Sequence, residues 1–143
     1  MTTKFGIHLK AKNIEDSLMF YKNFDFKEVF GYGDEKFLAK LSKSIPKAPE
    51  KYRGVVFEIG GALLEIADGH IAVKPEVFKE TIGSSKISAM VHIDSVDEVV
   101  KISKKNNYKI LVQPKVFPWG TREVVVRDPD GFVLVFIEKL KKN

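Results

Sequence analysis

FGIHLKAKNIEDSLMFY, residues 5–21, is the stretch that decides the fold. Apolar and polar residues alternate over 5–12, with Ile7 and Leu9 on the same side, which predicts a half-buried strand. Asn13 follows as a helix N-cap, with carboxylates in the first turn, where the helix dipole favours negative charge. Apolar residues then recur at helical spacing. The chain is therefore predicted to open with a strand that turns directly into a helix.

The rest of the first half reads mainly as strands. They are predicted at 26–31, 36–41, 55–59 and 62–67. Asp25 is a residue that tolerates the tight exit from the helix. Pro46 and Pro49 indicate a loop over 42–53. Gly60-Gly61 separates the last two strands and is a strong hairpin signal.

The second half repeats this order. A strand is predicted over 86–93, and Ser95-Val-Asp-Glu98 has the spacing of a capping box at a helix start. The helix ends near Asn106-Asn107. Further strands are predicted at 108–112, 122–127 and 132–137, with Asp128-Pro-Asp-Gly131 as a tight turn between the last two.

The two halves are therefore two β-α-β-β-β modules, an internal repeat at the level of topology. Gly6 corresponds to Ser88 with an offset of 82 positions, whereas Glu65 corresponds to Val135 with an offset of 70. The difference of 12 predicts an insertion in the first half, most simply the loop 42–53.

The amino-acid composition limits the kinds of protein that this chain can be. The chain has 143 residues, of which 44% are hydrophobic and 30% charged, and this fits one globular domain over 1–143. Module one is expected over 1–68, a connection over 69–85 and module two over 86–143. No apolar stretch is long enough for a membrane span or an export signal, and no cysteine is present. We therefore expect a cytoplasmic protein that does not associate with membranes.

The net charge of +5 is carried almost wholly by lysines that are spread along the chain. A nucleic-acid binder more often clusters its basic residues and uses arginine. The charge therefore argues against nucleic acid as a partner, and it favours anionic over cationic ligands.

Three segments carry a family resemblance: KNIEDSLMFY (12–21), PWGTRE (118–123) and RDPDG (127–131). The first resembles the strand-to-helix turn of the vicinal-oxygen-chelate superfamily, which includes glyoxalase I, the extradiol dioxygenases and the bleomycin-resistance proteins. The other two resemble the final hairpin of that superfamily. The resemblance implies an α+β fold in which two β-α-β-β-β modules form a curled mixed sheet around a cup. It also implies a homodimer, which would protect exposed sheet edges.

In metal-dependent relatives, the first and last strands of each module carry the metal ligands. Transferred to this chain, those positions are Gly6, Glu65, Ser88 and Val135. Glycine and valine have no donor atom, and serine is a poor ligand for transition metals. No metal or other cofactor is therefore expected, nor is metal-dependent glyoxalase or dioxygenase activity.

Two histidines leave an alternative open. His8 and His92 lie on the same strand faces as Gly6 and Ser88, but further along. A two-residue step moves a side chain about 6.6 Å, so they cannot simply replace the missing ligands. They line a polar cup, or they form a relocated metal site with Glu65. Glu65 is either a general base or a structural carboxylate paired with Lys10 or a histidine.

Several other side chains are candidates for the cup. Met90 either lines it or is a packing residue. Trp119 either stacks on a ligand or packs its own hairpin against the sheet. Arg122 either binds an anionic group or forms a salt bridge with Glu123 or Asp128. The expected ligand-binding residues are His8, Lys10, Glu65, Met90, His92, Trp119 and Arg122, with none assigned as catalytic.

We therefore expect a metal-free protein of the bleomycin-resistance type that binds or sequesters a small organic molecule. The basic charge disfavours bleomycin, which is cationic, and favours an anionic or neutral ligand. Two alternatives remain: a glyoxalase-like lyase or isomerase with a relocated metal or with Glu65 as base, and a subunit whose own side chains fill the cup.

Overall fold

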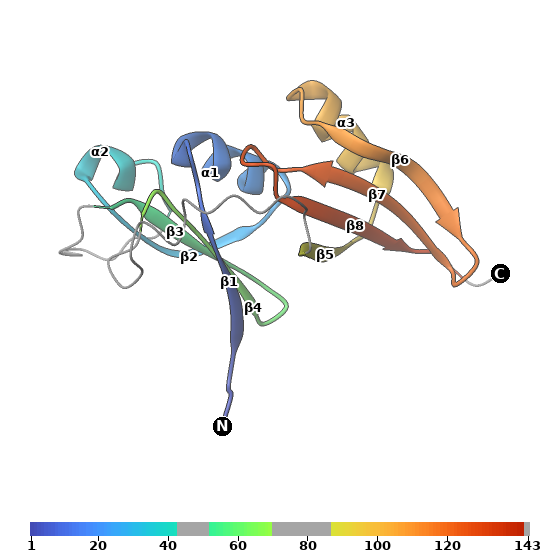
Figure 1. Cartoon of the computed structure of the whole chain (residues 1–143), viewed down its shortest axis with the longest axis horizontal. Coiled ribbons are helices and arrows are strands. Elements are labelled where there is room, and N and C mark those ends of the chain that lie inside the picture. Colours follow the sequence, from blue (N-terminus) through green and yellow to red (C-terminus); the bar gives the residue numbers. More distant parts are fainter. Residues whose placement is uncertain (43–51, 70–86, 142–143) are drawn as a thin grey trace. The chain divides into compact units, whose positions relative to one another are not determined.

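The chain folds into two compact units, Met1–Thr81 and Ile82–Asn143, in a computed structural model that describes residues 1–42, 52–69 and 87–141. Each unit contains its own four-stranded mixed sheet (Figure 1). Two internal segments lie outside the described residues: 43–51, which belongs to the expected loop, and 70–86, which includes His70. No helix in the described ranges is long and apolar enough to cross a membrane.

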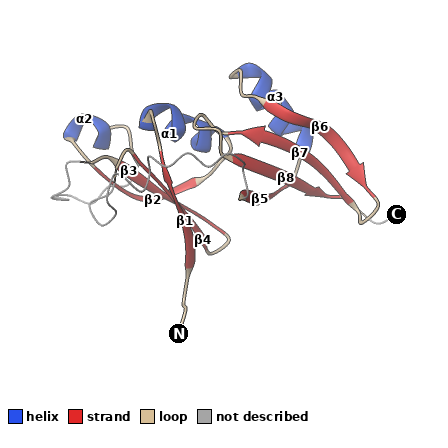
Figure 2. Ribbon diagram, viewed as in Figure 1, coloured by secondary structure: helices blue, strands red, loops and turns tan. Residues whose placement is uncertain are grey.

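The first unit has the expected order of elements, except that a short helix replaces the strand predicted over 36–41 (Figure 2). The elements are β1 (Phe5–Lys10), α1 (Ile14–Asn23), β2 (Lys27–Tyr32), α2 (Glu35–Leu38), β3 (Gly54–Ile59) and β4 (Ala62–Ala67). The strands lie in the order β1-β4-β3-β2. β1 runs parallel to β4, and the other neighbours are antiparallel.

The local signals around α1 are confirmed. The Asn13 side chain accepts hydrogen bonds from the backbone amides of Glu15 and Asp16, at 3.1 and 3.2 Å. Asp25 has a φ of 63°, the left-handed conformation that its short polar side chain tolerates. α1 then packs on the sheet through its aromatic face, because the ring of Tyr21 lies 5.8 Å from that of Phe57 on β3.

The strand predicted over 36–41 is wrong, because this segment begins with the short helix α2. Asp34 is its N-cap and accepts a hydrogen bond from the Phe37 amide at 2.9 Å. This turn buries Phe37, which is 1% exposed. The cap and the burial of one aromatic ring outweigh the strand-like composition of the segment.

The second unit contains β5 (Ser88–Ile93), α3 (Val96–Lys105), β6 (Ile110–Phe117), β7 (Thr121–Arg127) and β8 (Val133–Lys139). Its strands lie in the order β5-β8-β7-β6, and α3 packs against β6, β7 and β8. Ser95 is the N-cap of α3, as expected. The predicted turn at 128–131 is held by Asp128, whose side chain accepts the amides of Asp130 and Phe132.

β6 continues to Phe117, five residues beyond its predicted end. Pro114 lies inside it, and the register to β7 shifts twice between Ile110 and Lys115. β6 is the last strand of its sheet. Proline is tolerated there because one side of an edge strand makes no ladder hydrogen bonds.

The strand registers confirm the internal repeat. His8 lies opposite Glu65 in the first unit, and Met90 lies opposite Val135 in the second. These pairs are related by the offsets of 82 and 70 positions that the sequence predicts. The extra residues of the first unit lie between the end of β2 at Tyr32 and the start of β3 at Gly54.

Candidate functional site

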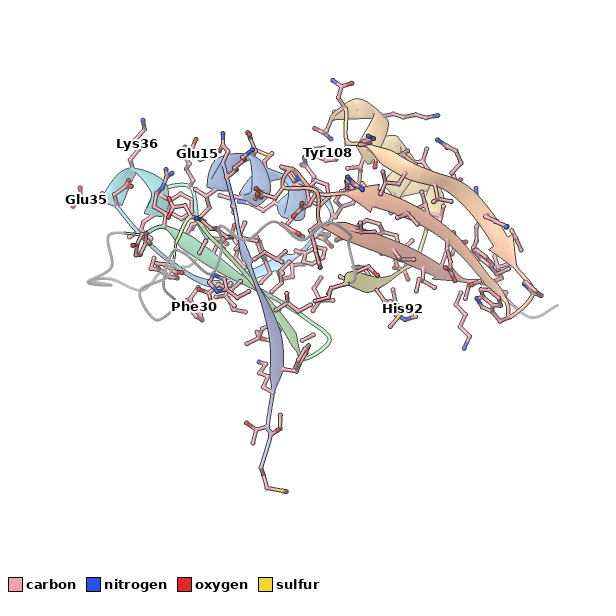
Figure 3. The ribbon with its side chains drawn as sticks, viewed as in Figure 1. Glu15, Phe30, Glu35, Lys36, His92 and Tyr108 are labelled. Atoms are coloured by element: carbon pink, nitrogen blue, oxygen red, sulfur yellow. The ribbon has the colours of Figure 1, made fainter. Side chains whose placement is uncertain are left out.

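Each sheet has one side that faces its helix and another that we call the open face. In the first unit, Phe57 contacts Tyr21 of α1, so its neighbours in the strand, Val56 and Glu58, point to the open face. Figure 3 shows Phe30, which lies opposite Val56, projecting from β2 on the side away from α1. The candidate residues of this unit can be placed from that starting point.

Two rows of side chains cross the open face of the first unit. The strand registers give the first row as His8, Glu65, Val56 and Phe30. The second row is Lys10, Ala67, Gly54 and Tyr32. Three expected ligand-binding residues, His8, Lys10 and Glu65, therefore share one face on adjacent strands. The Nε2 atom of His8 is buried there.

Tyr32 belongs to this site and was missed by the sequence-based prediction. Its hydroxyl lies 2.7 Å from Oε1 of Glu65 and donates a hydrogen bond to the carboxylate. Tyr32 is only 6% exposed. The expectation that Glu65 pairs with Lys10 or a histidine did not include this partner, which reaches it from the far edge strand, β2.

The open face of the second unit has a different chemistry. The row that corresponds to His8, Glu65, Val56 and Phe30 is Met90, Val135, Val125 and Val112. The next row is His92, Ile137, Glu123 and Lys115. Figure 3 shows His92 projecting from β5 on the side away from α3. Met90 is 74% exposed, so it is not a core packing residue within the described structure.

Trp119 lies at the end of this second open face. Its ring stacks on Phe117 with centroids 4.6 Å apart and planes 14° apart. Its Nε1–H donates to Oε1 of Glu123 at 3.2 Å, and the same oxygen accepts from the hydroxyl of Thr121 at 2.6 Å. The indole nevertheless stays 67% exposed. It is thus fixed by its own hairpin and still presents a large aromatic surface.

Arg122 is oriented to the other side of the sheet. It alternates with Glu123 along β7, and its Nη2 lies 2.8 Å from Oδ1 of Asp97, at the start of α3. The hydrogen bond to Asp97 raises the pKa of Arg122, and the same bond lowers the pKa of Asp97. Its salt-bridge partner is therefore Asp97, and it is not grouped with Met90, His92 and Trp119.

The positions that the resemblance implies for metal ligands do not fit a metal ion. At Gly6, a Cβ atom would lie 2.9 Å from the Cβ of Leu63, so even alanine would force a shift. Val135 has no donor, and Ser88 is a poor one. Within the described ranges, no group of three His, Cys, Asp or Glu side chains is placed to hold a metal ion.

Comparisons with known proteins agree with this architecture. The model of the Glyoxalase/Bleomycin resistance protein/Dioxygenase superfamily matches residues 7–136. No curated protein sequence matches the chain significantly.

Solved structures of low sequence identity share the fold. A mutant of the fosfomycin resistance protein FosX from Listeria monocytogenes, complexed with Mn(II) and a dihydroxypropylphosphonic acid, is 19% identical, with a TM-score of 0.63 over 95% of this chain and 91% of that one. A superfamily member from Sphaerobacter thermophilus is 21% identical, with a TM-score of 0.63 over 97% and 98% of the two chains. TioX from Micromonospora is 18% identical, with a TM-score of 0.63 over 97% and 100%. With a family match over most of its length, the chain belongs to the glyoxalase/bleomycin resistance protein/dioxygenase superfamily.

Proposed function

We propose that this protein binds a small organic ligand without a metal ion, in the manner of the bleomycin-resistance proteins. The observation that carries this proposal is the chemistry of the four implied ligand positions. Two of them have no donor, one has a weak donor, and the fourth is Glu65, whose carboxylate accepts a hydrogen bond from Tyr32. These side chains do not support the usual metal chemistry of the superfamily. The open faces of the sheets are therefore the proposed ligand-binding surfaces.

Each open face offers a ligand its own set of groups, which are polar in the first unit and largely apolar in the second. His8, Lys10 and Glu65 supply polar groups on one open face. On the other, Met90 and Trp119 supply apolar surface beside His92. Arg122 is left out, because its guanidinium is paired with Asp97 on the helix side of its sheet.

An anionic or neutral ligand fits this protein better than a cationic one. The net charge of +5 raises the local concentration of anions around the molecule. Lys10 gives the first open face a cationic group for a carboxylate or phosphate. We further propose that the protein is cytoplasmic and forms a homodimer, since each sheet has two edge strands that a second chain could cover.

The intrinsic fluorescence of Trp119 provides a test, because Trp119 is the only tryptophan in the chain. Titration with a panel of carboxylates, phosphates and organic ammonium compounds is expected to change its emission and to give saturable binding of anionic or neutral members. Isothermal titration confirms each hit, and Trp119→Phe controls for optical artefacts. A uniform preference for the ammonium compounds, or no binding by any member, would contradict the proposal.

One observation favours the enzymatic alternative. His8 lies directly opposite Glu65 in the β1–β4 ladder, so two potential metal donors, or a general base and a proton carrier, are neighbours. Stoichiometric metal in the purified protein would support a relocated site. Catalysis that Glu65→Gln abolishes would support a metal-free base.

A further inference from the structure

Tyr32 lies across the open face of the first unit because the strand beneath it carries a glycine. Tyr32 and Gly54 are direct neighbours in the β2–β3 ladder. A Cβ atom on Gly54 would lie 2.3 Å from Cζ of Tyr32 and 2.4 Å from its hydroxyl oxygen. These distances are far below van der Waals contact, so any side chain at position 54 would displace the ring.

The ring position lets the tyrosine reach over one strand. Glu65 lies on β4, on the far side of β3 from Tyr32, and its ladder neighbour on β3 is Val56. The phenol crosses above Gly54 and donates to Oε1 of Glu65 at 2.7 Å. A bond to a charged acceptor is among the stronger hydrogen bonds in proteins, so Tyr32 fixes the orientation of this carboxylate.

The oriented carboxylate of Glu65 can accept hydrogen bonds from a ligand. An ionised carboxylate has roughly four lone-pair sites, all of them acceptors, and the hydroxyl of Tyr32 donates to Oε1 of Glu65. A carboxylate or phosphate of the ligand placed against Glu65 would meet a like charge. A hydroxyl or amide N–H would instead donate to it, while Lys10, one row further along β1, suits an anionic group.

We infer that Tyr32 is a positioning residue that makes Glu65 the acceptor for a neutral hydrogen-bond donor of the ligand. The ligand class is then an organic anion that also carries a hydroxyl or amide N–H group. The donor group contacts Glu65, and the anionic group lies toward Lys10. This inference rests on the proposed binding function, and it narrows the ligand chemistry beyond "anionic or neutral".

A matched pair of probes tests the inference: 6-hydroxyhexanoate and hexanoate, which differ by one hydroxyl. Their affinities are measured from chemical-shift changes in heteronuclear NMR spectra, which report weak binding. Wild type is expected to bind 6-hydroxyhexanoate about tenfold more tightly, the typical effect of a hydrogen bond to a charged group. In Tyr32→Phe the preference is expected to fall to about twofold or less, because Glu65 loses the donor that orients it.

Two further variants make the result specific. Gly54→Ala displaces the same ring without changing the tyrosine, and it is expected to lose the preference as well. Tyr108→Phe removes a phenol hydroxyl from the second unit and is expected to keep it. Because the readout is a ratio of two affinities, a general loss of stability does not imitate the result.

The possible outcomes separate the inference from the function beneath it. Equal binding of both probes by wild type, or an unchanged preference in Tyr32→Phe, would overturn the role of Tyr32 and leave the binding function standing. If neither probe binds, the inference is overturned, and the ligand panel described above decides separately whether the binding function stands.

Discussion

Replacement of Phe57 by alanine is expected to lower the free energy of unfolding by about 3–5 kcal/mol. Phe57 is fully buried on β3, and its ring packs 5.8 Å from that of Tyr21 and 6.1 Å from that of Phe26. Alanine removes the apolar ring and leaves a cavity beneath α1 that rigid strand and helix backbones cannot close. Chemical denaturation followed by circular dichroism measures the change.

Phe5→Ala serves as the matched control for Phe57→Ala. Phe5 is 72% exposed on β1, so the same truncation is expected to change stability by no more than about 0.5 kcal/mol. A loss below about 1 kcal/mol for Phe57→Ala would show that α1 does not pack on the sheet through this residue.

Acid is expected to destabilise the first unit through Glu28. The Glu28 side chain is 3% exposed and lies 3.0 Å from Nζ of Lys22. Its Oε2 accepts from the amide and from the hydroxyl of Ser42, both at 2.6 Å. Burial by itself raises the pKa of Glu28, but the hydrogen bonds from Ser42 and Lys22 outweigh it, so the pKa is lowered.

The sign of the pH effect follows from this lowered pKa. Since the folded state holds its proton less tightly than the unfolded state, Glu28 contributes its full stabilisation above the unfolded pKa of about 4.5. This stabilisation is lost as the pH falls through the lower pKa that Glu28 has in the folded state. Glu28→Gln is expected to cost about 2–3 kcal/mol at neutral pH, because charge-assisted hydrogen bonds are lost. The free energy of unfolding of Glu28→Gln is also expected to fall less than that of wild type as the pH is lowered from neutral to acidic.

Glu15→Gln is the control for Glu28→Gln. The pKa of Glu15 is also lowered, chiefly by its hydrogen bond to Lys40. Its side chain is 46% exposed, however, so solvent screens the ion pair and the variant is expected to behave like wild type. Parallel acid-denaturation curves for wild type and Glu28→Gln would contradict the assignment of the acid effect to Glu28.

The features that sequence patterns predicted correctly are those with local causes. Asn13 caps its helix with amides two and three residues away, and Asp128 holds its turn with amides two and four residues away. Interactions of this range are specified by neighbouring residues and do not depend on the fold. The offsets of the repeat were also recoverable, because strand and helix periodicities restart at corresponding positions.

The features that sequence patterns missed depend on contacts between distant segments. The bond from Tyr32 to Glu65 joins residues 33 positions apart, and Arg122 and Asp97 are 25 apart. Sequence periodicity gives the face of a strand but not the register between strands. Gly54 offered the one signal for Tyr32, since a glycine inside a strand often marks a close approach by another group.

This protein has the superfamily fold, and we propose that it binds its ligand without a metal ion. The most direct measurement is elemental analysis of the purified protein after equilibration with nickel, zinc, manganese and iron and removal of unbound metal. Far less than one metal ion per chain is expected for wild type, with the same content in Glu65→Ala and His8→Ala. About one ion per wild-type chain, lost in both variants, would contradict metal-free binding and establish a relocated metal site at His8 and Glu65.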